Sequence, residues 1–217
     1  MSMRWEDLLF AHWPIGPELL QPFLPNGVEL DVRDDCAWLG VVPFRMAETK
    51  MRFAPGIPSA TSFPELNVRT YVTCAGKPGI WFFSLDAGSW LAVRAARQFF
   101  HLPYFDARME ASPRGARVVY SSVRTHRGAP SAEFRAEYAP VGPVIRSAPG
   151  SLEHWLTERY CLYSTDPQGM LWRGEIHHSP WPLQTAQASI GRNTMTTPLG
   201  FEFSEPPPLL HLSLIHI

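Results

Sequence analysis

Lysine is almost absent from this chain: it occurs only at Lys50 and Lys77, so arginine carries nearly all of the positive charge. The formal net charge is −1, and no general electrostatic field therefore draws the protein to nucleic acid or to an anionic membrane. Chemistry that needs a lysine amine has just two candidates. We expect a small-molecule partner rather than a nucleic acid or a membrane, and a homo-oligomer is left open.

Cysteine is scarce as well, with Cys36, Cys74 and Cys161 far apart in the sequence. No CxxC pair is present, which excludes a disulfide framework and a zinc ribbon. No run approaches the roughly eighteen apolar residues of a membrane span. Glu6 and Asp7 stand where a signal peptide needs an apolar segment. These absences predict a cytoplasmic protein with reduced thiols.

Motifs that hold a nucleophile or a phosphate group are also missing. The sequence has no GxSxG, no GxGxxG and no GxxxxGKS/T. His177 and His178 are the most conspicuous histidines, but adjacent residues of a strand face opposite ways and cannot share one metal ion. We therefore expect no metal and no cofactor, and we assign His178 to the rim of a ligand pocket.

Turn residues, in contrast, are plentiful, and 22 prolines and 15 glycines divide the chain into short strands. Helices are predicted at residues 17–23, 90–100 and 151–163, and the last of them carries Cys161. The remaining segments alternate or are rich in β-branched and aromatic residues. This order predicts a mainly β, α+β fold: a bent sheet or β-barrel with a few helices packed on it.

No repeat and no low-complexity linker divides the chain, so residues 1–208 are expected to form one domain. Residues 46–62 have the composition of an irregular loop, which includes Lys50. The segment 209–217 is apolar and ends abruptly. We expect this tail to be atypical, either truncated or artefactual.

The most informative stretch is a predicted strand at residues 63–71. Glu65, Asn67 and Arg69 alternate there with two apolar residues and a threonine, so the three polar side chains share one face. At roughly 3.3 Å per residue, Glu65 and Arg69 lie about 13 Å apart and cannot pair directly. Two interpretations stay open: a solvated sheet face, or the charged wall of a pocket.

Further residues are predicted to complete such a pocket. Arg97, on the second predicted helix, could meet Glu65 or bind a carboxylate through two nitrogens. Trp81, Phe83 and Tyr104 would form an aromatic wall beside it. Together with the polar strand face, these side chains predict a site for a small anionic or carbonyl-bearing molecule.

Five segments of the chain resemble one known group of proteins, the uncharacterised YqjF-like conserved family. They are residues 39–44, 63–71, 81–86, 152–160 and 176–183, and the resemblance extends over about residues 4–208. The family is in turn distantly similar to the acetoacetate-decarboxylase-like superfamily. The resemblance therefore implies a β-barrel with a cone-shaped interior.

The decarboxylases of that superfamily offer a residue-by-residue comparison. Glu65 stands where they have an inward glutamate, and Arg97 and Pro103 are similar to their Gly-Arg-Glu helix and the proline that follows it. Tyr104 and Phe105, however, occupy the positions of their two lysines, one of which forms a Schiff base. The resemblance therefore carries over a glutamate and an arginine, but not the amine.

Schiff-base decarboxylation needs an amine of lowered pKa. Lys50 falls in the predicted loop and Lys77 at a predicted hairpin tip, where water keeps an ammonium group charged and mobile. Neither lysine replaces the missing one. We predict that the protein has no acetoacetate decarboxylase activity.

Three functions remain in competition. The leading hypothesis is a binding protein whose barrel interior holds the small molecule between Glu65, Arg69 and Arg97, with Asn67, Trp81 and His178 as further contacts. The second is a lysine-independent enzyme of lyase or hydrolase type, with Glu65 as general acid or base and Tyr104 as proton donor or oxyanion partner. The third is a structural or interaction protein with a filled barrel.

Overall fold

The computed structural model describes residues 2–50, 62–203, 207 and 209–216. In chain order, its elements are β1 (Ser2–Ile15), α1 (Pro17–Leu20), the 3-10 helix η1 (Gln21–Phe23), β2 (Glu29–Leu30), β3 (Ala37–Lys50), β4 (Phe63–Cys74), β5 (Lys77–Ala87), α3 (Trp90–Phe100), β6 (Tyr104–Arg114), β7 (Arg117–Arg124), β8 (Glu133–Pro140), β9 (Ile145–Arg146), α4 (Leu152–Thr157), β10 (Cys161–Thr165), β11 (Leu171–Glu175), β12 (Pro182–Asn193), the 3-10 helix η2 (Thr197–Leu199) and β13 (Leu209–His216).

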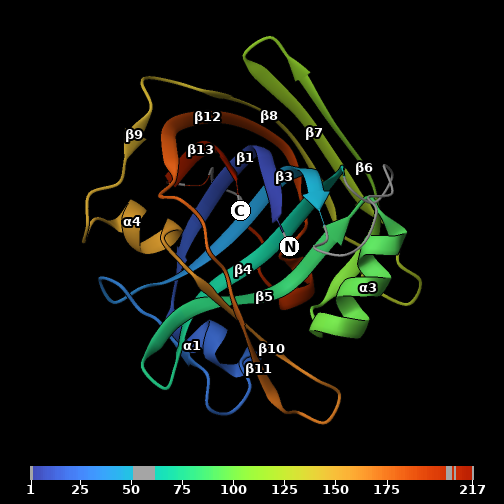
Figure 1. Ribbon diagram of the computed structural model, residues 1–217, viewed down its shortest axis with the longest axis vertical. Helices are drawn as coiled ribbons and strands as arrows, with labels where there is room; N and C mark the ends of the chain where they lie inside the picture. Colours follow the sequence, from blue (N-terminus) through green and yellow to red (C-terminus); the bar gives the residue numbers. More distant parts are fainter. Residues whose placement is uncertain (1, 51–61, 204–206, 208, 217) are drawn as a thin grey trace.

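The strands form a closed ring (Figure 1). Within the described residues its order is β5-β6-β7-β8-β12-β13-β1-β3-β4, and the ring closes because β4 pairs with β5. Neighbours in the ring are antiparallel except β5 and β6, which run parallel and are joined through α3. The predicted mainly β fold, a barrel with a few helices on it, is confirmed.

Successive side chains of a strand point to opposite faces of the sheet. In the part of the ring formed by β1, β3, β4 and β5, the side chains on both faces are buried. The inner face carries Leu66 and Val68, which share an apolar core with Tyr120 of β7 and Phe134 of β8 across the ring. We call the opposite side the outer face. There Phe10 and Phe44 pack with further apolar residues, including Val93 of α3 and Trp181.

The outer face is covered by chain that follows β11. The segment between β11 and β12 crosses in front of β4 and β5 in Figure 1 and brings Trp181 edge-on to Phe10, with ring centroids 5.1 Å apart. Trp155 of α4 packs on the same outer face, with its ring centroid 5.2 Å from that of Tyr71. Both faces of this sheet are therefore removed from solvent.

The predicted helix at 151–163 is too long. Ser151 caps α4 through the backbone N–H of His154, as its position suggests, but Glu158 leaves the helical region and α4 ends at Thr157. Cys161 begins β10 instead, where the chain gains pairing with β11 and with β5. Tertiary pairing thus overrides the local helical pattern.

One other predicted segment differs from the structure. β3 continues as far as Lys50, so the predicted loop at 46–62 is partly strand, while its residues 51–61 lie outside the described residues. The tail, expected to be atypical, contributes β13, which pairs with β12 and β1.

Candidate functional site

The three alternating polar residues of β4 are all buried. Glu65, Asn67 and Arg69 expose 2%, 1% and 3% of their surface, which excludes the solvated-face interpretation. They lie on the outer face of the ring, not in its interior, because Leu66 and Val68 occupy the inner positions. The expectation of a site inside the barrel is therefore corrected: the ring interior is filled, mostly by apolar side chains.

Glu65 is hydrogen bonded to Tyr104. The hydroxyl of Tyr104 donates toward the carboxylate, at 3.1 Å from Oε1 and 3.0 Å from Oε2. The two meet because Leu85, the cross-strand neighbour of Asn67, is also the neighbour of Tyr104 on parallel strand β6. Tyr104 is therefore level with Asn67, which is two residues from Glu65 on the same face, and it lies two strands away from β4.

Burial raises the pKa of Glu65 to about 8. The hydrogen bond from Tyr104 acts in the opposite direction, and the charge of Asp86 on the adjacent strand adds to the rise. Burial, followed by the charge and the hydrogen bond of Glu65, raises the pKa of Tyr104 well above its usual value. Glu65 is thus largely protonated at neutral pH, while Tyr104 stays neutral.

The backbone of Glu65 is held from the inner face. The hydroxyl of Tyr120 donates to the carbonyl oxygen of Glu65 at 2.7 Å and to that of Phe44 at 3.1 Å. Beside it, Arg124 forms a buried pair with Asp86, with Nη2 and Oδ1 2.6 Å apart. The residues that fill the barrel therefore fix the strand that carries the site.

Arg69 is a buried cation without a counter-ion. Within the described part of the chain it forms no ion pair; its Nη2 donates to the hydroxyl of Tyr71 at 3.3 Å. Its guanidinium lies 5.2 Å from the ring centroid of Phe10 and 5.7 Å from that of Tyr71. Burying a charge without a partner costs several kcal/mol, roughly, so such an arginine is unusual in a purely structural role.

His12 of β1 joins this group. Its Nε2 lies 2.6 Å from the Tyr71 hydroxyl, and burial, together with the charges of Arg69 and His211, lowers the pKa of His12 well below its usual value. Gly40 separates His12 from Arg69 in the sheet: a Cβ there would lie 3.1 Å from Cδ2 of His12 and 3.4 Å from Cγ of Arg69. The missing side chain makes room for both.

Several polar atoms on this face have no hydrogen-bond partner among the described residues. They are Oδ1 of Asn67, Nε of Arg69, Nδ1 of His12 and Nε1 of Trp181. Buried polar groups in folded proteins nearly always have a partner. Asn67 stands two residues from both Glu65 and Arg69, about 7 Å along the strand. A small polar molecule over Asn67 could therefore contact both charged neighbours.

His178 does not turn its ring nitrogens toward this group of polar residues. β11 ends at Glu175, so His178 lies in an irregular segment rather than on the predicted strand. Its Nδ1 is 2.8 Å from the carbonyl oxygen of Ser179, and its Nε2 is 3.3 Å from that of Arg159. The ring also stacks on Tyr160 at 4.4 Å. His178 thus fastens the covering segment, and both of its ring nitrogens lie against backbone carbonyl oxygens.

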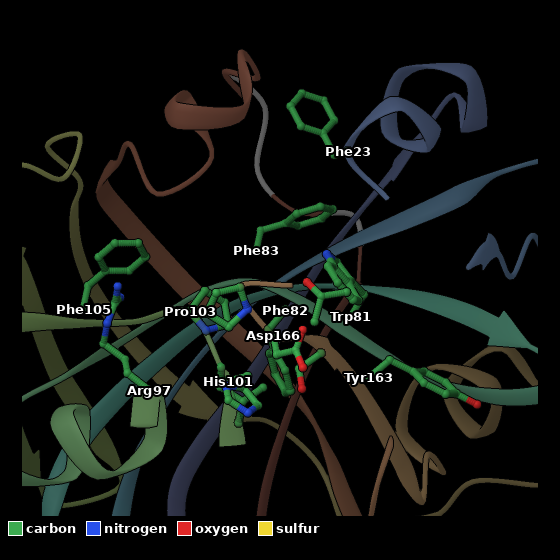
Figure 2. A pocket seen from close by; sticks show the side chains of 14 residues that line it. Phe23, Trp81, Phe82, Phe83, Arg97, His101, Pro103, Phe105, Tyr163 and Asp166 are labelled. Atoms are coloured by element: carbon green, nitrogen blue, oxygen red, sulfur yellow. The ribbon is translucent and has the colours of Figure 1, made fainter. Parts of the chain in front are cut away.

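Arg97 and Trp81 do not join Glu65 either. Arg97 projects from the last turn of α3, is exposed, and donates through Nη1 to the backbone carbonyl of Tyr104 at 2.7 Å. The predicted contact between Arg97 and Glu65 is therefore corrected. Arg97 and Trp81 instead line a separate surface pocket of about 540 Å³ (Figure 2).

Sequence reasoning missed His12, Gly40 and Tyr71. Phe10 and His12 alternate with buried apolar residues of β1, so strand periodicity could have placed both on one face. Their meeting with Arg69 depends on pairing of β1 with β3 and of β3 with β4. No local motif encodes that arrangement.

Two classes of feature are absent from the described residues. They contain no group of three or more His, Cys, Asp or Glu side chains that could hold a metal ion. None of their helices is long and apolar enough to cross a membrane.

Similarity to known proteins identifies the family of this chain. The model of the DUF2071 family, described as an uncharacterized conserved protein, matches residues 2–214. The chain belongs to this family. A relative, the uncharacterized protein YqjF of Bacillus subtilis (strain 168), is 46% identical over 211 residues, which cover 97% of this chain and 86% of YqjF. The predicted family is confirmed, and the match continues into the tail at 209–217.

Solved structures of similar fold have much lower identity. Acetoacetate decarboxylase from Legionella pneumophila gives a TM-score of 0.62 at 13% identity, covering 100% of this chain and 84% of that one. The enduracididine biosynthesis enzyme MppR complexed with pyruvate gives 0.60 at 10% identity, covering 99% and 85%. The chain therefore has the acetoacetate-decarboxylase-like fold, as predicted, and these likenesses carry no more than the fold.

Proposed function

We propose that the outer-face site binds a small 2-oxo acid, with its carboxylate at Arg69 and its carbonyl group at Glu65 and Tyr104. The observation that carries this proposal is the buried guanidinium of Arg69, which has no carboxylate partner among the described residues. Arginine binds carboxylates through paired hydrogen bonds, and the pairing is strongest where water is excluded.

The other end of the site suits a carbonyl oxygen. Glu65 has a pKa of about 8, so at neutral pH its carboxyl group carries a proton that it can donate. Asn67 lies between Glu65 and Arg69, and its Oδ1 has no partner among the described residues. A small acid held over Asn67, which is about 7 Å along the strand from each charged neighbour, would have one of them on either side. The pyruvate named for MppR supports this choice of size and chemistry.

A Schiff base has no place in the proposal. Tyr104 occupies the position beside Glu65, and the ammonium group of Lys77 is held at 2.6 and 2.8 Å by the carboxylate of Glu175 at an exposed hairpin. The ligand would thus be held by charge and hydrogen bonds alone. Within the same proposal, residues 1–208, together with strand β13 that completes the ring, act as one unit in the cytoplasm.

Isothermal titration with pyruvate tests the proposal. Arg69→Met should weaken binding by about 10- to 100-fold, since a hydrogen bond to a charged group is worth roughly 1.5–3 kcal/mol. Arg69→Lys should retain part of the affinity. Arg117→Met, which removes an exposed arginine paired with Glu137, is the control and should bind as the wild type does. Equal affinity of wild type and Arg69→Met would contradict the proposal.

A second candidate function is an acid–base enzyme, favoured by the pKa of Glu65 near 8 and its contact with Tyr104. An ideal catalytic group has a pKa close to the working pH. The ionised fraction of Glu65 would take a proton from the carbon next to the carbonyl group, and the resulting enolate oxygen would accept a hydrogen bond from Tyr104. After exchange with solvent, Glu65 would return a proton to the same carbon. Exchange of the methyl protons of pyruvate in D₂O, followed by NMR, tests this; Glu65→Gln should abolish exchange while leaving binding.

A further inference from the structure

β5 pairs with β4 along one edge and with two different strands, β10 and β6, along the other. β10 runs parallel to its first half, pairing with Ile80 and Trp81, and β6 runs parallel to its last part, pairing from Leu85 onward. The residues between, 82–84, pair with neither strand on that edge. The sheet forks at this point, and the pocket of about 540 Å³ lies in the fork. Ligands of α/β proteins often bind where neighbouring strands diverge in this way.

The walls of this fork pocket are rich in aromatic rings. Six of its fourteen lining residues are aromatic, namely Phe23, Trp81, Phe82, Phe83, Phe105 and Tyr163. In Figure 2, Phe105 and Arg97 stand at one end and Tyr163 at the other, with Trp81 between. The volume falls within the usual range of small-molecule pockets, roughly 300–1,000 Å³. Flat, apolar walls of this kind suit a planar aromatic ligand.

One charged group of the pocket is available to bind an anion. Arg97 forms no ion pair within the described residues, and its guanidinium lies 5.8 Å from the ring centroid of Phe105. Asp166 also lines the pocket, but its oxygens are already occupied. Oδ1 accepts from the backbone N–H groups of Gln168 and Met170, and Oδ2 accepts from the indole of Trp172. Arg97 is therefore the charge that remains for a ligand.

We propose that the fork pocket is a second binding site, which takes a planar aromatic carboxylate with its ring against Trp81 and Phe83 and its carboxylate on Arg97. This site is distinct from the outer-face site. Phe82 and Leu102 line the pocket and pack in one apolar cluster with Leu85 and Tyr104, which separates the two spaces. The proposal does not depend on whether the outer-face site binds a 2-oxo acid.

Titration with 2-naphthoate and its neutral counterpart 2-naphthamide tests the assignment. Arg97→Met should weaken 2-naphthoate binding about tenfold or more, and should leave 2-naphthamide unchanged. Arg94→Met is the matched control, because Arg94 lies one turn earlier on α3 and is paired with Asp106 instead. It should bind both compounds as the wild type does.

Two more measurements locate 2-naphthoate in the fork pocket rather than on the outer face. Phe83→Ala should weaken both compounds, since it removes part of the aromatic wall. Arg69→Met and added pyruvate should leave 2-naphthoate binding unchanged. Absence of binding to the wild type, equal affinity of wild type and Arg97→Met, or loss of 2-naphthoate binding in Arg69→Met would each overturn the proposal.

Discussion

The hydroxyl of Tyr104 lies 3.0 and 3.1 Å from the two carboxylate oxygens of Glu65, which is a buried residue. Tyrosine here takes the place at which the resemblance to decarboxylases led us to look for a lysine. A lysine beside Glu65 would favour its ionised form through charge, whereas a neutral phenol supplies one hydrogen bond. With tyrosine in place of lysine, Glu65 therefore has a neutral hydrogen-bonding partner and not a cationic one.

Removing that hydroxyl should move the titration of Glu65. The hydrogen bond from Tyr104 lowers the pKa of Glu65, so Tyr104→Phe should raise this pKa above about 8. The pH titration of the Glu65 carboxyl carbon by ¹³C NMR measures the change. A pKa that stays the same or falls in the variant would show that the hydroxyl does not stabilise the carboxylate.

Glu65 should also make stability depend on pH. Its pKa is about 8 in the folded protein against 4.5 when unperturbed, so between these values the folded state binds more protons than the unfolded state. Its contribution is thus fully present below pH 4.5 and is lost as the pH rises through 8, by at most about 5 kcal/mol. Urea unfolding at pH 5 and pH 8.5 should show this decline in wild type and a smaller one in Glu65→Gln. Parallel pH profiles for the two proteins would contradict it.

Arg69 should cost stability in the free protein. It is buried without an ionic partner among the described residues, so Arg69→Met should raise the free energy of unfolding by on the order of 1 kcal/mol, as expected of a group retained for binding. Urea denaturation without ligand measures the difference. Marked destabilisation by Arg69→Met would assign the side chain to the structure rather than to a ligand.

Gly40 should not tolerate a side chain. A Cβ at Gly40 would crowd His12 at 3.1 and 3.2 Å, and Gly40→Ala should destabilise the protein by about 1–3 kcal/mol, typical of overpacking. Gly191→Ala on β12 is the matched control, since nothing lies within 4 Å of its Cβ. Thermal unfolding of both variants compares them, and equal midpoints would show that His12 and Arg69 move aside freely.

The sequence predicts the polar face of β4 well because strand periodicity is a local property. Two-residue alternation is enough to put Glu65, Asn67 and Arg69 on one face, and the structure buries that whole face. The resemblance to a known family supplies what alternation lacks, namely the fold around the strand and the position of Tyr104 near Glu65.

Arg97 and His12 show where such reasoning ends. Whether Arg97 reaches Glu65 depends on how α3 packs on the sheet, and its exposed last turn places the guanidinium outside the site. His12 meets Tyr71, which is 59 residues away in the chain, through pairings between three strands. These contacts are tertiary, and neither propensity nor spacing within one segment contains them.

The hydroxyl of Tyr120 links the filled interior of the barrel to the strand that carries the site, by bonding the carbonyl oxygens of Glu65 and Phe44. Sequence drift among the residues packed around Tyr120 can therefore shift the position of Glu65 without touching any ligand. Substitutions in the core could therefore change the ligand affinity of this protein while every site residue stays the same. Screens for altered ligand preference should accordingly include the inner apolar positions as well as the outer polar ones.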